Sequence, residues 1–359
     1  MKDDQDEDRL LAVKRRMLMK GGPALLAAAG VAAMTKNAYA AEASPFPAHK
    51  RWRLVFVNHV TTNPFFVATQ YGIQDACALF GCDYQWTGSQ TAVVGEMVNA
   101  MNAAIASQAD AIGIAIVDPE AFNAPTAAAL EAGIPVFSYN ADAPADSGNK
   151  RLAYIGQDLF KSGYEMGQKV VALVGSGHVA LFIATPGQLN IQPRIDGAAA
   201  AIKASGKPIT YEEIATGATI DEELPKIKAY YLGHQDVKGM FAVDAGSTQC
   251  VGQVMQEFNL GAKGVHGGGF DLVPRTLQSI HEGILDFTID QQPYLQGFYT
   301  VMEMVMYLAS GGLVGPADIN TGLKFVVKGN VDPYLHSSTR YEGDSAKPQI
   351  VPRSGPIGA

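Results

Sequence analysis

Between residues 51 and 310, short runs of β-branched and aromatic residues alternate with longer stretches in which apolar residues recur every three or four positions. The short runs predict strands and the longer stretches predict amphipathic helices. We expect strands over residues 53–58, 83–86, 111–116, 135–139, 178–184, 208–214, 239–243, 265–270 and 285–289. We expect helices over residues 64–80, 92–107, 119–132, 157–174, 192–205, 220–232, 246–258, 274–282 and 293–310.

Strands separated by single helices indicate repeated β-α-β units and therefore parallel sheets. Nine strands would make a very wide single sheet, so we predict an α/β fold with two doubly wound parallel-sheet lobes. The alternation restarts after the Ala-, Asp- and Gly-rich loop 141–150, and Pro293 opens the last long helix. We therefore expect one lobe over residues 51–155 and 292–315, a second over residues 156–291, and a C-terminal segment, 316–359, that packs across the lobes and then extends.

The first 40 residues have the pattern of an export signal. A basic region with Arg15 and Arg16 precedes a small-residue apolar run over residues 23–34, and Ala38-Tyr39-Ala40 follows. The paired arginines resemble a twin-arginine signal. The apolar run is shorter than the roughly 20 residues that span a membrane, and no later segment is long and apolar enough. We expect cleavage after about Ala40 and a periplasmic location.

Charge, cysteine and histidine content argue against nucleic-acid binding, a disulfide framework and a metal site. Without residues 1–40 the chain carries 20 basic and 30 acidic side chains, a net charge of −10, and no basic stripe that would bind nucleic acid. Three cysteines are too few for a disulfide framework; Cys77 and Cys82 either pair or are buried as small hydrophobic residues. The seven histidines are scattered without zinc-ligand spacing, so we expect neither a metal nor a cofactor.

The residues directly after the predicted strands are mostly Asn, Gln and Asp. The carboxyl ends of parallel strands meet at one edge of a sheet, where ligands of open α/β folds bind. Carboxylate and amide groups suit hydroxyls, which both donate and accept hydrogen bonds, although single Asn and Asp residues there can simply cap helices. The strand-end residues include Asn58, His59, Asn63, Gln90, Asp118, Asn140, Asp142, Thr185, Gln188, Asn190, Gln192, Arg194, Thr216, Asp244, Asp271, Asp290 and Gln291.

The turn after the first strand is the most informative stretch. Asn63 can cap a helix, Pro64 suits its first position, and Phe65 and Phe66 follow. Adjacent helical residues face about 100° apart, so we do not expect both phenylalanines to be buried in the same place. We predict that they form part of a platform for a small, neutral, hydroxyl-rich molecule; burial in the core is the alternative.

Four motifs occur in a familiar order: Asn63-Pro64-Phe65-Phe66, residues 134–140, Gly268-Gly269-Phe270-Asp271, and residues 289–293. Together they resemble the ribose-type periplasmic sugar-binding proteins, the solute receptors of ABC importers, over roughly residues 51–328. The resemblance implies two lobes joined by a three-segment hinge, with the ligand in the cleft between them. It also implies a monomer that delivers its ligand to the membrane domains of a permease.

The resemblance also implies a set of ligand contacts, namely Asn63, Phe65, Phe66, Asn140, Asp244, Asp271 and Gln291, with Gln192 and Arg194 as further candidates. The sequence departs from the family pattern at two places. The Asp-Arg pair expected after the fourth strand reads Asn140-Ala141, and an arginine expected before Arg194 reads Gln192. Because both changes remove guanidinium contacts, a monosaccharide other than ribose or a linear polyol becomes the expected ligand.

We therefore predict a periplasmic solute-binding protein of a carbohydrate ABC importer. A sugar receptor for a chemoreceptor or sensor kinase remains the alternative, and a secreted α/β enzyme acting on a carbohydrate is less favoured. Residues 175–177 precede a strand and residues 267–269 lie within one, whereas phosphate-binding glycines lie between a strand and a helix. There is no Gly-x-Ser-x-Gly elbow either, so we do not expect an enzyme.

Overall fold

The computed structural model describes residues 48–313 and 315–335 of the 359-residue chain. The expected export signal with its cleavage site, and the final tail from residue 336, lie outside these residues. The described residues form twelve strands, arranged as two six-stranded sheets.

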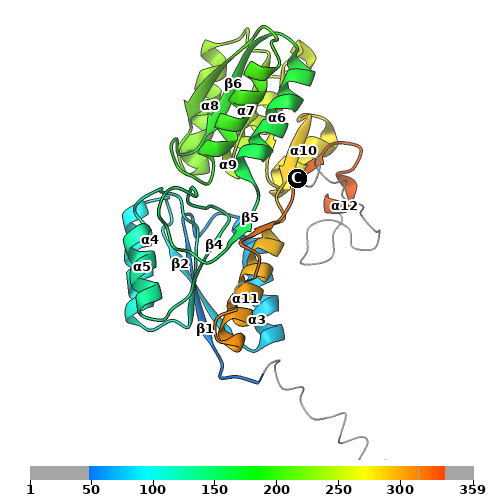
Figure 1. The fold of residues 1–359 in the computed structure, drawn as a ribbon. Helices are drawn as coiled ribbons and strands as arrows, with labels where there is room; N and C mark the ends of the chain where they lie inside the picture. Colours follow the sequence, from blue (N-terminus) through cyan, green and yellow to red (C-terminus); the bar gives the residue numbers. More distant parts are fainter. Residues whose placement is uncertain (1–47, 314, 336–359) are drawn as a thin grey trace, which may run out of the picture. The chain divides into compact units, whose positions relative to one another are not determined.

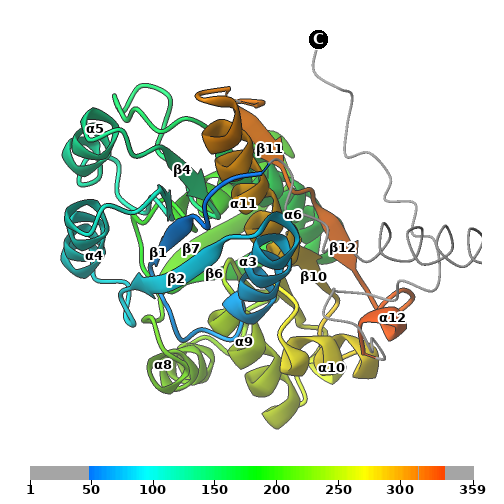
Figure 2. The ribbon, with the colours of Figure 1, turned by 90° about the horizontal axis from the view of Figure 1, so that it is seen from below.

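The N-terminal lobe is built on the first sheet. Its strands lie in the order β11 (Asp318–Asn320), β5 (Tyr154–Gly156), β4 (Val136–Tyr139), β3 (Ala111–Ile114), β1 (Arg53–Asn58) and β2 (Asp83–Gly88). All pairs are parallel. Helices α4 (Val94–Ala106) and α5 (Asn123–Glu131) cover one face, and α3 (Phe66–Phe80) and α11 (Pro293–Ser310) cover the other (Figure 2). The central strands β1 and β3 are buried on both faces and are therefore almost continuously apolar.

The C-terminal lobe repeats this arrangement. Its strands lie in the order β12 (Lys324–Val326), β10 (Phe287–Asp290), β9 (His266–Phe270), β8 (Gly239–Ala242), β6 (Gly177–Ile183) and β7 (Ile209–Ala215). All pairs are parallel except β10 and β12, which are antiparallel. In both sheets the strand order reverses beside the first strand of the lobe, between β1 and β3 and between β6 and β8. Open α/β sheets bind their ligands at such switch points.

The C-terminal lobe has two hydrophobic cores, one on each face of its sheet, and alternate residues of β6 belong to one core or the other. Leu181 packs with α6 (Leu159–Val174) and α7 (Gln192–Ala204). Phe182, which points to the opposite face, packs with α8 (Ile220–Gly233), α9 (Ala245–Glu257) and α10 (Pro274–Glu282). This period of two is the geometry of a strand between two helical layers. A 3-10 turn, η1 (Gly261–Lys263), and the short helix α12 (Asp332–Leu335) complete the lobe.

The chain passes between the two sheets three times. It leaves the first sheet after β5 and enters α6, returns after β10 through Gln291 and Gln292 into α11, and crosses again between β11 and β12 (Figure 1). The predicted fold class, two parallel-sheet α/β lobes, is confirmed. Three short strands were not predicted: β5, β11 and β12 have three residues each and lack a long β-branched run.

None of the helices among the described residues is long and apolar enough to span a membrane. Cys77, Cys82 and Cys250 are all buried as free thiols, so the structure has no bond between Cys77 and Cys82. Within residues 48–313 and 315–335, His, Cys, Asp and Glu side chains form no group of three that could hold a metal ion.

Candidate ligand-binding site

The strand ends of both lobes line a cavity of about 50 Å³, which we call the first cavity. Eight of the nine predicted contact residues lie in its wall: Asn63, Phe65, Phe66, Asn140, Arg194, Asp244, Asp271 and Gln291. The wall also contains His59, Asn190, Ile191 and Ala245. The ninth predicted residue, Gln192, lies outside the first cavity.

Phe65 and Phe66 form an aromatic wall. Their ring centroids are 4.8 Å apart in an edge-to-face arrangement, which aromatic pairs prefer. Both are buried, in one apolar cluster with Ala245 and Val273 of the C-terminal lobe. The expectation that they would not be buried together is wrong. Phe65 has helical backbone angles, φ −50° and ψ −41°, but residues of the C-terminal lobe pack against both rings.

The turn before α3 sets the residue at which that helix begins. The Asn63 side-chain oxygen accepts a hydrogen bond from the Phe65 N–H at 3.0 Å, which holds the chain in a tight turn. The helix therefore begins at Phe66, two residues later than Pro64 suggests. A short side chain bonded to the backbone two residues on is a common alternative to a helix cap.

Asn140 and Asp271 follow β4 and β9 with left-handed backbone, at φ of 64° and 77°. Most non-glycine residues avoid this region, but Asn and Asp tolerate it. The backbone N–H groups remain bonded to neighbouring strands, Asn140 to Ile155 O at 3.1 Å and Asp271 to Ile289 O at 2.8 Å. Such backbone is concentrated at functional sites, and here it places two polar side chains in the cavity wall.

A chain of hydrogen bonds links these two residues across the lobes. The Asn140 amide donates to Gln296 Oε1 at 3.1 Å, and Gln296 Nε2 donates to Gln291 Oε1 at 3.1 Å. Gln291 Nε2 in turn donates to Asp271 Oδ1 at 2.6 Å. Gln296, on α11, was not predicted; it lies beyond the strand ends, where a buried glutamine gives no sequence signal. Because Gln291 lies in the second crossover, the network joins both walls of the cavity through the hinge.

Arg194 is the only basic residue in the wall of the first cavity. Its guanidinium donates to Val243 O at 2.8 Å and to Gln157 Oε1 at 3.1 Å, and it stacks on the Phe270 ring at 4.0 Å. Its Nε is buried without a partner. Burial lowers the pKa of Arg194, whereas the nearby Asp271 carboxylate opposes that shift. The Arg194 guanidinium is therefore held in place by the protein, and its Nε–H remains a hydrogen-bond donor without a protein acceptor.

Two carboxylates face this guanidinium from the C-terminal lobe. Asp244 caps α9 by accepting from Ser247 N at 2.8 Å and also accepts from Ala184 N at 2.9 Å. Burial raises the pKa of Asp244. Burial also raises the pKa of Asp271 to about 6, despite the opposing effect of Arg194. With one guanidinium and two carboxylates, the wall disfavours an anionic ligand.

His59 and Asn190 meet across the two lobes. His59 Nε2 lies 3.1 Å from Asn190 Nδ2. Burial lowers the pKa of His59 to about 4, so the ring is neutral at pH 7. Since Asn190 Nδ2 can only donate, His59 Nε2 accepts and Nδ1 carries the proton. Both residues were recognised as strand-end residues but not included among the nine predicted contacts.

Three buried polar atoms around the first cavity lack a partner: His59 Nδ1, Asn190 Oδ1 and Arg194 Nε. Unpaired buried polar atoms are rare in folded proteins because each costs about 1–3 kcal/mol. Two of these atoms are donors and one is an acceptor. A ligand with several hydroxyl groups would satisfy both kinds.

Gln192 is engaged elsewhere. Its Oε1 accepts from Gly187 N at 2.7 Å, and its Nε2 donates to Asp196 and Glu213, each at 3.2 Å. It is the first residue of α7, whereas Arg194, two residues later, turns into the cavity wall.

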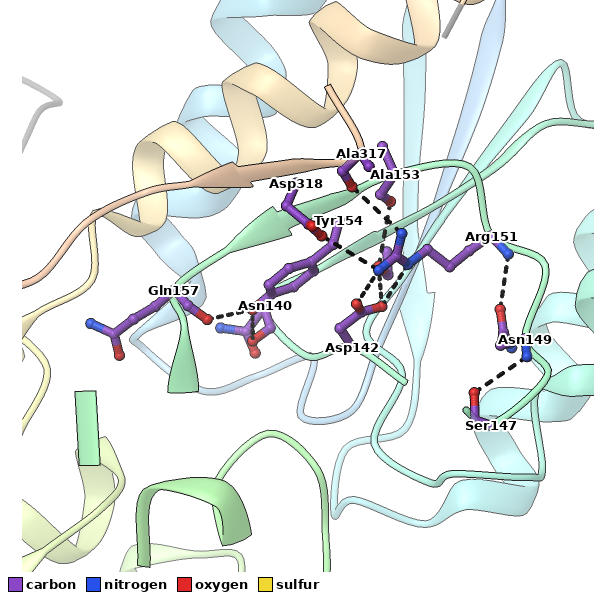
Figure 3. Close-up of polar contacts among 11 residues, drawn as sticks. Asn140, Asp142, Ser147, Asn149, Arg151, Ala153, Tyr154, Gln157, Ala317 and Asp318 are labelled. Carbon is purple, nitrogen blue, oxygen red and sulfur yellow. Dashed lines mark hydrogen bonds and ion pairs between the residues drawn. The ribbon is translucent and has the colours of Figure 1, made fainter. Parts of the chain in front are cut away.

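The family pattern has an arginine after Asn140, where this chain has Ala141. Arg151 lies nearby but does not take the place of that arginine in the first cavity. Arg151 makes a two-point ion pair with Asp142, including Nε to Oδ1 at 2.8 Å, and lies 3.5 Å from Asp318 (Figure 3). Tyr154 donates to the Asn140 carbonyl at 3.2 Å from the same side. The guanidinium is thus paired with carboxylates and is not part of the first cavity.

Comparison with known proteins agrees with this geometry. Residues 54–312 match the family model described as the periplasmic binding protein domain. The chain belongs to the periplasmic binding protein family. The resemblance predicted from the four motifs is therefore confirmed.

Members of this family supply both sequence and structural relatives. The xylose/arabinose-binding protein XylF of Sulfolobus acidocaldarius is 53% identical over 311 residues, covering 83% of this chain and 76% of that protein. An ABC transporter solute-binding protein of Burkholderia graminis, solved with D-arabinose, is 26% identical with a TM-score of 0.73, covering 79% and 97% of the two chains. An Agrobacterium vitis solute-binding protein, solved with D-fucose, shares the fold at 21% identity, a TM-score of 0.74 and coverage of 78% and 97%.

Proposed function

We propose that this periplasmic binding protein captures a neutral monosaccharide or sugar alcohol in the first cavity and delivers it to the permease of an ABC importer. The observation that carries the proposal is the set of unpaired donors and acceptors beside an aromatic wall, at the switch points of both sheets. Saccharide hydroxyls pair with such groups, and ring C–H groups pack on aromatic faces. XylF is named for two pentoses and the Burkholderia protein was solved with one, which supports a sugar ligand.

The export signal expected at the N-terminus and the family membership together support a periplasmic location. The protein would act as a binding protein rather than an enzyme, and as a monomer.

Hinge closure would couple binding to delivery. Asn63, Phe65 and Asn140 come from the N-terminal lobe, whereas Asp244 and Asp271 come from the C-terminal lobe. A ligand that contacts both groups binds the closed form more tightly than the open form and shifts the population toward it. The permease would then recognise the closed form.

The direct test is the Asp271→Asn variant. Asparagine tolerates the left-handed backbone at this position, so the fold should survive while the charged acceptor is lost. Loss of one charge-assisted hydrogen bond of about 1.5–3 kcal/mol predicts a fall in affinity of about 10- to 150-fold. Titration calorimetry with the best ligand would measure it.

That ligand would come from a thermal-shift panel of pentoses, hexoses, polyols and sugar acids, because a ligand that binds the folded state raises the melting temperature. Exposed Asp146→Asn is the matched control and should bind as the wild type does. Stabilisation by sugar acids alone would refute a neutral ligand, and unchanged affinity of Asp271→Asn would refute the site.

A further inference from the structure

A second cavity of about 180 Å³ adjoins the first and is larger than it. Both lobes contribute to its wall. The N-terminal lobe supplies Val60, Thr62, Asn63, Pro64 and Gln90, and the C-terminal lobe supplies Ala218, Thr219, Ile220, Glu223, Ala245, Gly246, Gln249 and Val273. A molecule in the second cavity would therefore also contact both lobes.

The partition between the two cavities is thin. Asn63 and Ala245 line both cavities. Phe65 and Phe66 of the first cavity also pack with Val273 of the second, a contact between side chains of different lobes. A small opening of the lobes would part it. On the C-terminal side the residue shared by the two cavities is Ala245, whose side chain is a single methyl group.

A hydrogen bond links the walls of the two cavities. Asp244 lines the first cavity and Glu223 lines the second, and the Glu223 carboxyl hydrogen bonds to Asp244. Burial and the Asp244 charge raise the pKa of Glu223 to about 9, so this carboxyl is neutral at pH 7. A Cβ at Gly246 would lie 2.2 Å from Glu223 Oε2, so a larger residue at position 246 would displace this carboxyl.

The remaining polar groups of the second cavity are uncharged. They are the hydroxyls of Thr62 and Thr219 and the amides of Asn63, Gln90 and Gln249, and the wall contains no lysine or arginine. Neutral groups that both donate and accept, beside the apolar surfaces of Val60, Ile220 and Val273, suit a second sugar ring in the same way as the first cavity suits one.

We propose that the second cavity is a subsite for a second sugar unit, so that the protein binds a neutral disaccharide with one unit in each cavity. The glycosidic linkage would pass the partition between Asn63 and Ala245. This inference rests on the proposed function, since it takes the first cavity as the monosaccharide site.

The test compares one sugar with its disaccharide. Titration calorimetry would use D-xylose and the β-1,4-linked disaccharide of xylose, with other monosaccharide and disaccharide pairs if the thermal-shift panel favours another sugar. The wild type should bind the disaccharide at least as tightly as the monosaccharide. Ala218 lines the second cavity but not the first, so in Ala218→Phe a ring would fill the second cavity alone. Disaccharide affinity should then fall at least tenfold and monosaccharide affinity should change less than twofold.

Two further variants keep the test decisive. Exposed Ala128→Phe, on α5, controls for the added ring and should change neither affinity. Gln249→Ala removes one amide from the second cavity without adding bulk and should weaken disaccharide binding about threefold to tenfold even if Ala218→Phe does not fold.

Monosaccharide binding without disaccharide binding would overturn the subsite and leave the proposed function intact. Equal losses for both ligands in Ala218→Phe would also overturn it. Failure of every saccharide to bind the wild type would instead overturn the proposed function.

Discussion

Asn140 combines an unfavourable backbone conformation with a side chain in the wall of the proposed binding site. Its left-handed backbone turns the chain at the end of β4, and its amide lies in the cavity wall and bonds to Gln296. Glycine adopts this backbone freely, whereas alanine pays about 1–2 kcal/mol for it. Substitutions at residue 140 can therefore distinguish the effect of the backbone conformation on stability from the effect of the amide on ligand affinity.

We expect Asn140→Gly and Asn140→Ala to lose ligand affinity equally, because both remove the amide. Asn140→Ala should also have a free energy of unfolding about 1 kcal/mol lower than that of Asn140→Gly. Denaturant unfolding and calorimetry on the two variants would measure these effects. Equal stabilities would show that the backbone at residue 140 carries no strain.

At the scale of residues, the sequence predicts which residues lie at the strand ends but not which of them pair. It placed Asn63, Asn140, Asp244 and Asp271 because each follows a predicted strand. It did not find the bond between His59 and Asn190, which lie 131 residues apart in different lobes. The joint burial of Phe65 and Phe66 could not be predicted, because it depends on contacts with Ala245 and Val273 of the other lobe.

At the scale of elements, glycines set the distance between helices in both lobes. A Cβ at Gly163 of α6 would lie 2.1 Å from the Arg194 carbonyl of α7, and one at Gly197 would lie 2.1 Å from Phe160 O. The pair α3 and α11 repeats this, with Gly72 against Tyr294 O and Gly297 against Thr69 O. Helices α6 and α7 therefore touch backbone to backbone, and this contact positions Arg194.

Gly163→Ala should push α7 away from α6. We expect the free energy of unfolding to fall by about 1–3 kcal/mol through overpacking, and ligand affinity to fall because Arg194 moves with α7. Gly95→Ala is the matched control. A Cβ at Gly95 of α4 meets nothing within 4 Å, so this variant should be more stable by up to about 1 kcal/mol. Denaturant unfolding of both variants would measure these free energies. A Gly163→Ala protein as stable as the wild type would show that the backbone contact between α6 and α7 is not tight.

The long elements could be predicted because each satisfies a period over many residues. The helices α10 and α11 have the predicted bounds, Pro274–Glu282 and Pro293–Ser310, since proline marks each start and glycine each end. The strands β5, β11 and β12 could not be predicted. Their pairing is set by the rest of each sheet, for example by Tyr154 beside Asp318, rather than by their own three residues.

In the whole molecule, the lobes also touch along the rim of the cleft. Leu189 N donates to Val117 O at 2.9 Å, and the Gln188 amide donates to Ala92 O at 3.0 Å. These bonds join the loop after β6 to loops of the N-terminal lobe, beside the bond between His59 and Asn190. Opening of the lobes, as proposed above, would break these bonds, so they would stabilise the closed form selectively.

We expect Gln188→Ala to lower ligand affinity about twofold to tenfold, mainly through faster dissociation, because a hydrogen bond of about 0.5–1.5 kcal/mol is lost from the closed form alone. Gln188 does not line the first or second cavity, so ligand preference should stay unchanged. Stopped-flow dissociation would measure the effect, with exposed Gln278→Ala on α10 as the control. A dissociation rate equal to that of the wild type would mean that the rim does not hold the lobes together.

The triple passage of the chain between the sheets also sets an order of folding. The N-terminal lobe needs α11 to cover one face of its sheet and β11 to pair with β5, and both follow the whole C-terminal lobe in the sequence. A ribosome therefore releases the last pieces of the first lobe only after the second lobe has been synthesised. Until then the apolar face of the sheet that α11 covers is exposed. We therefore expect the incompletely synthesised chain to need a chaperone more than the finished protein does.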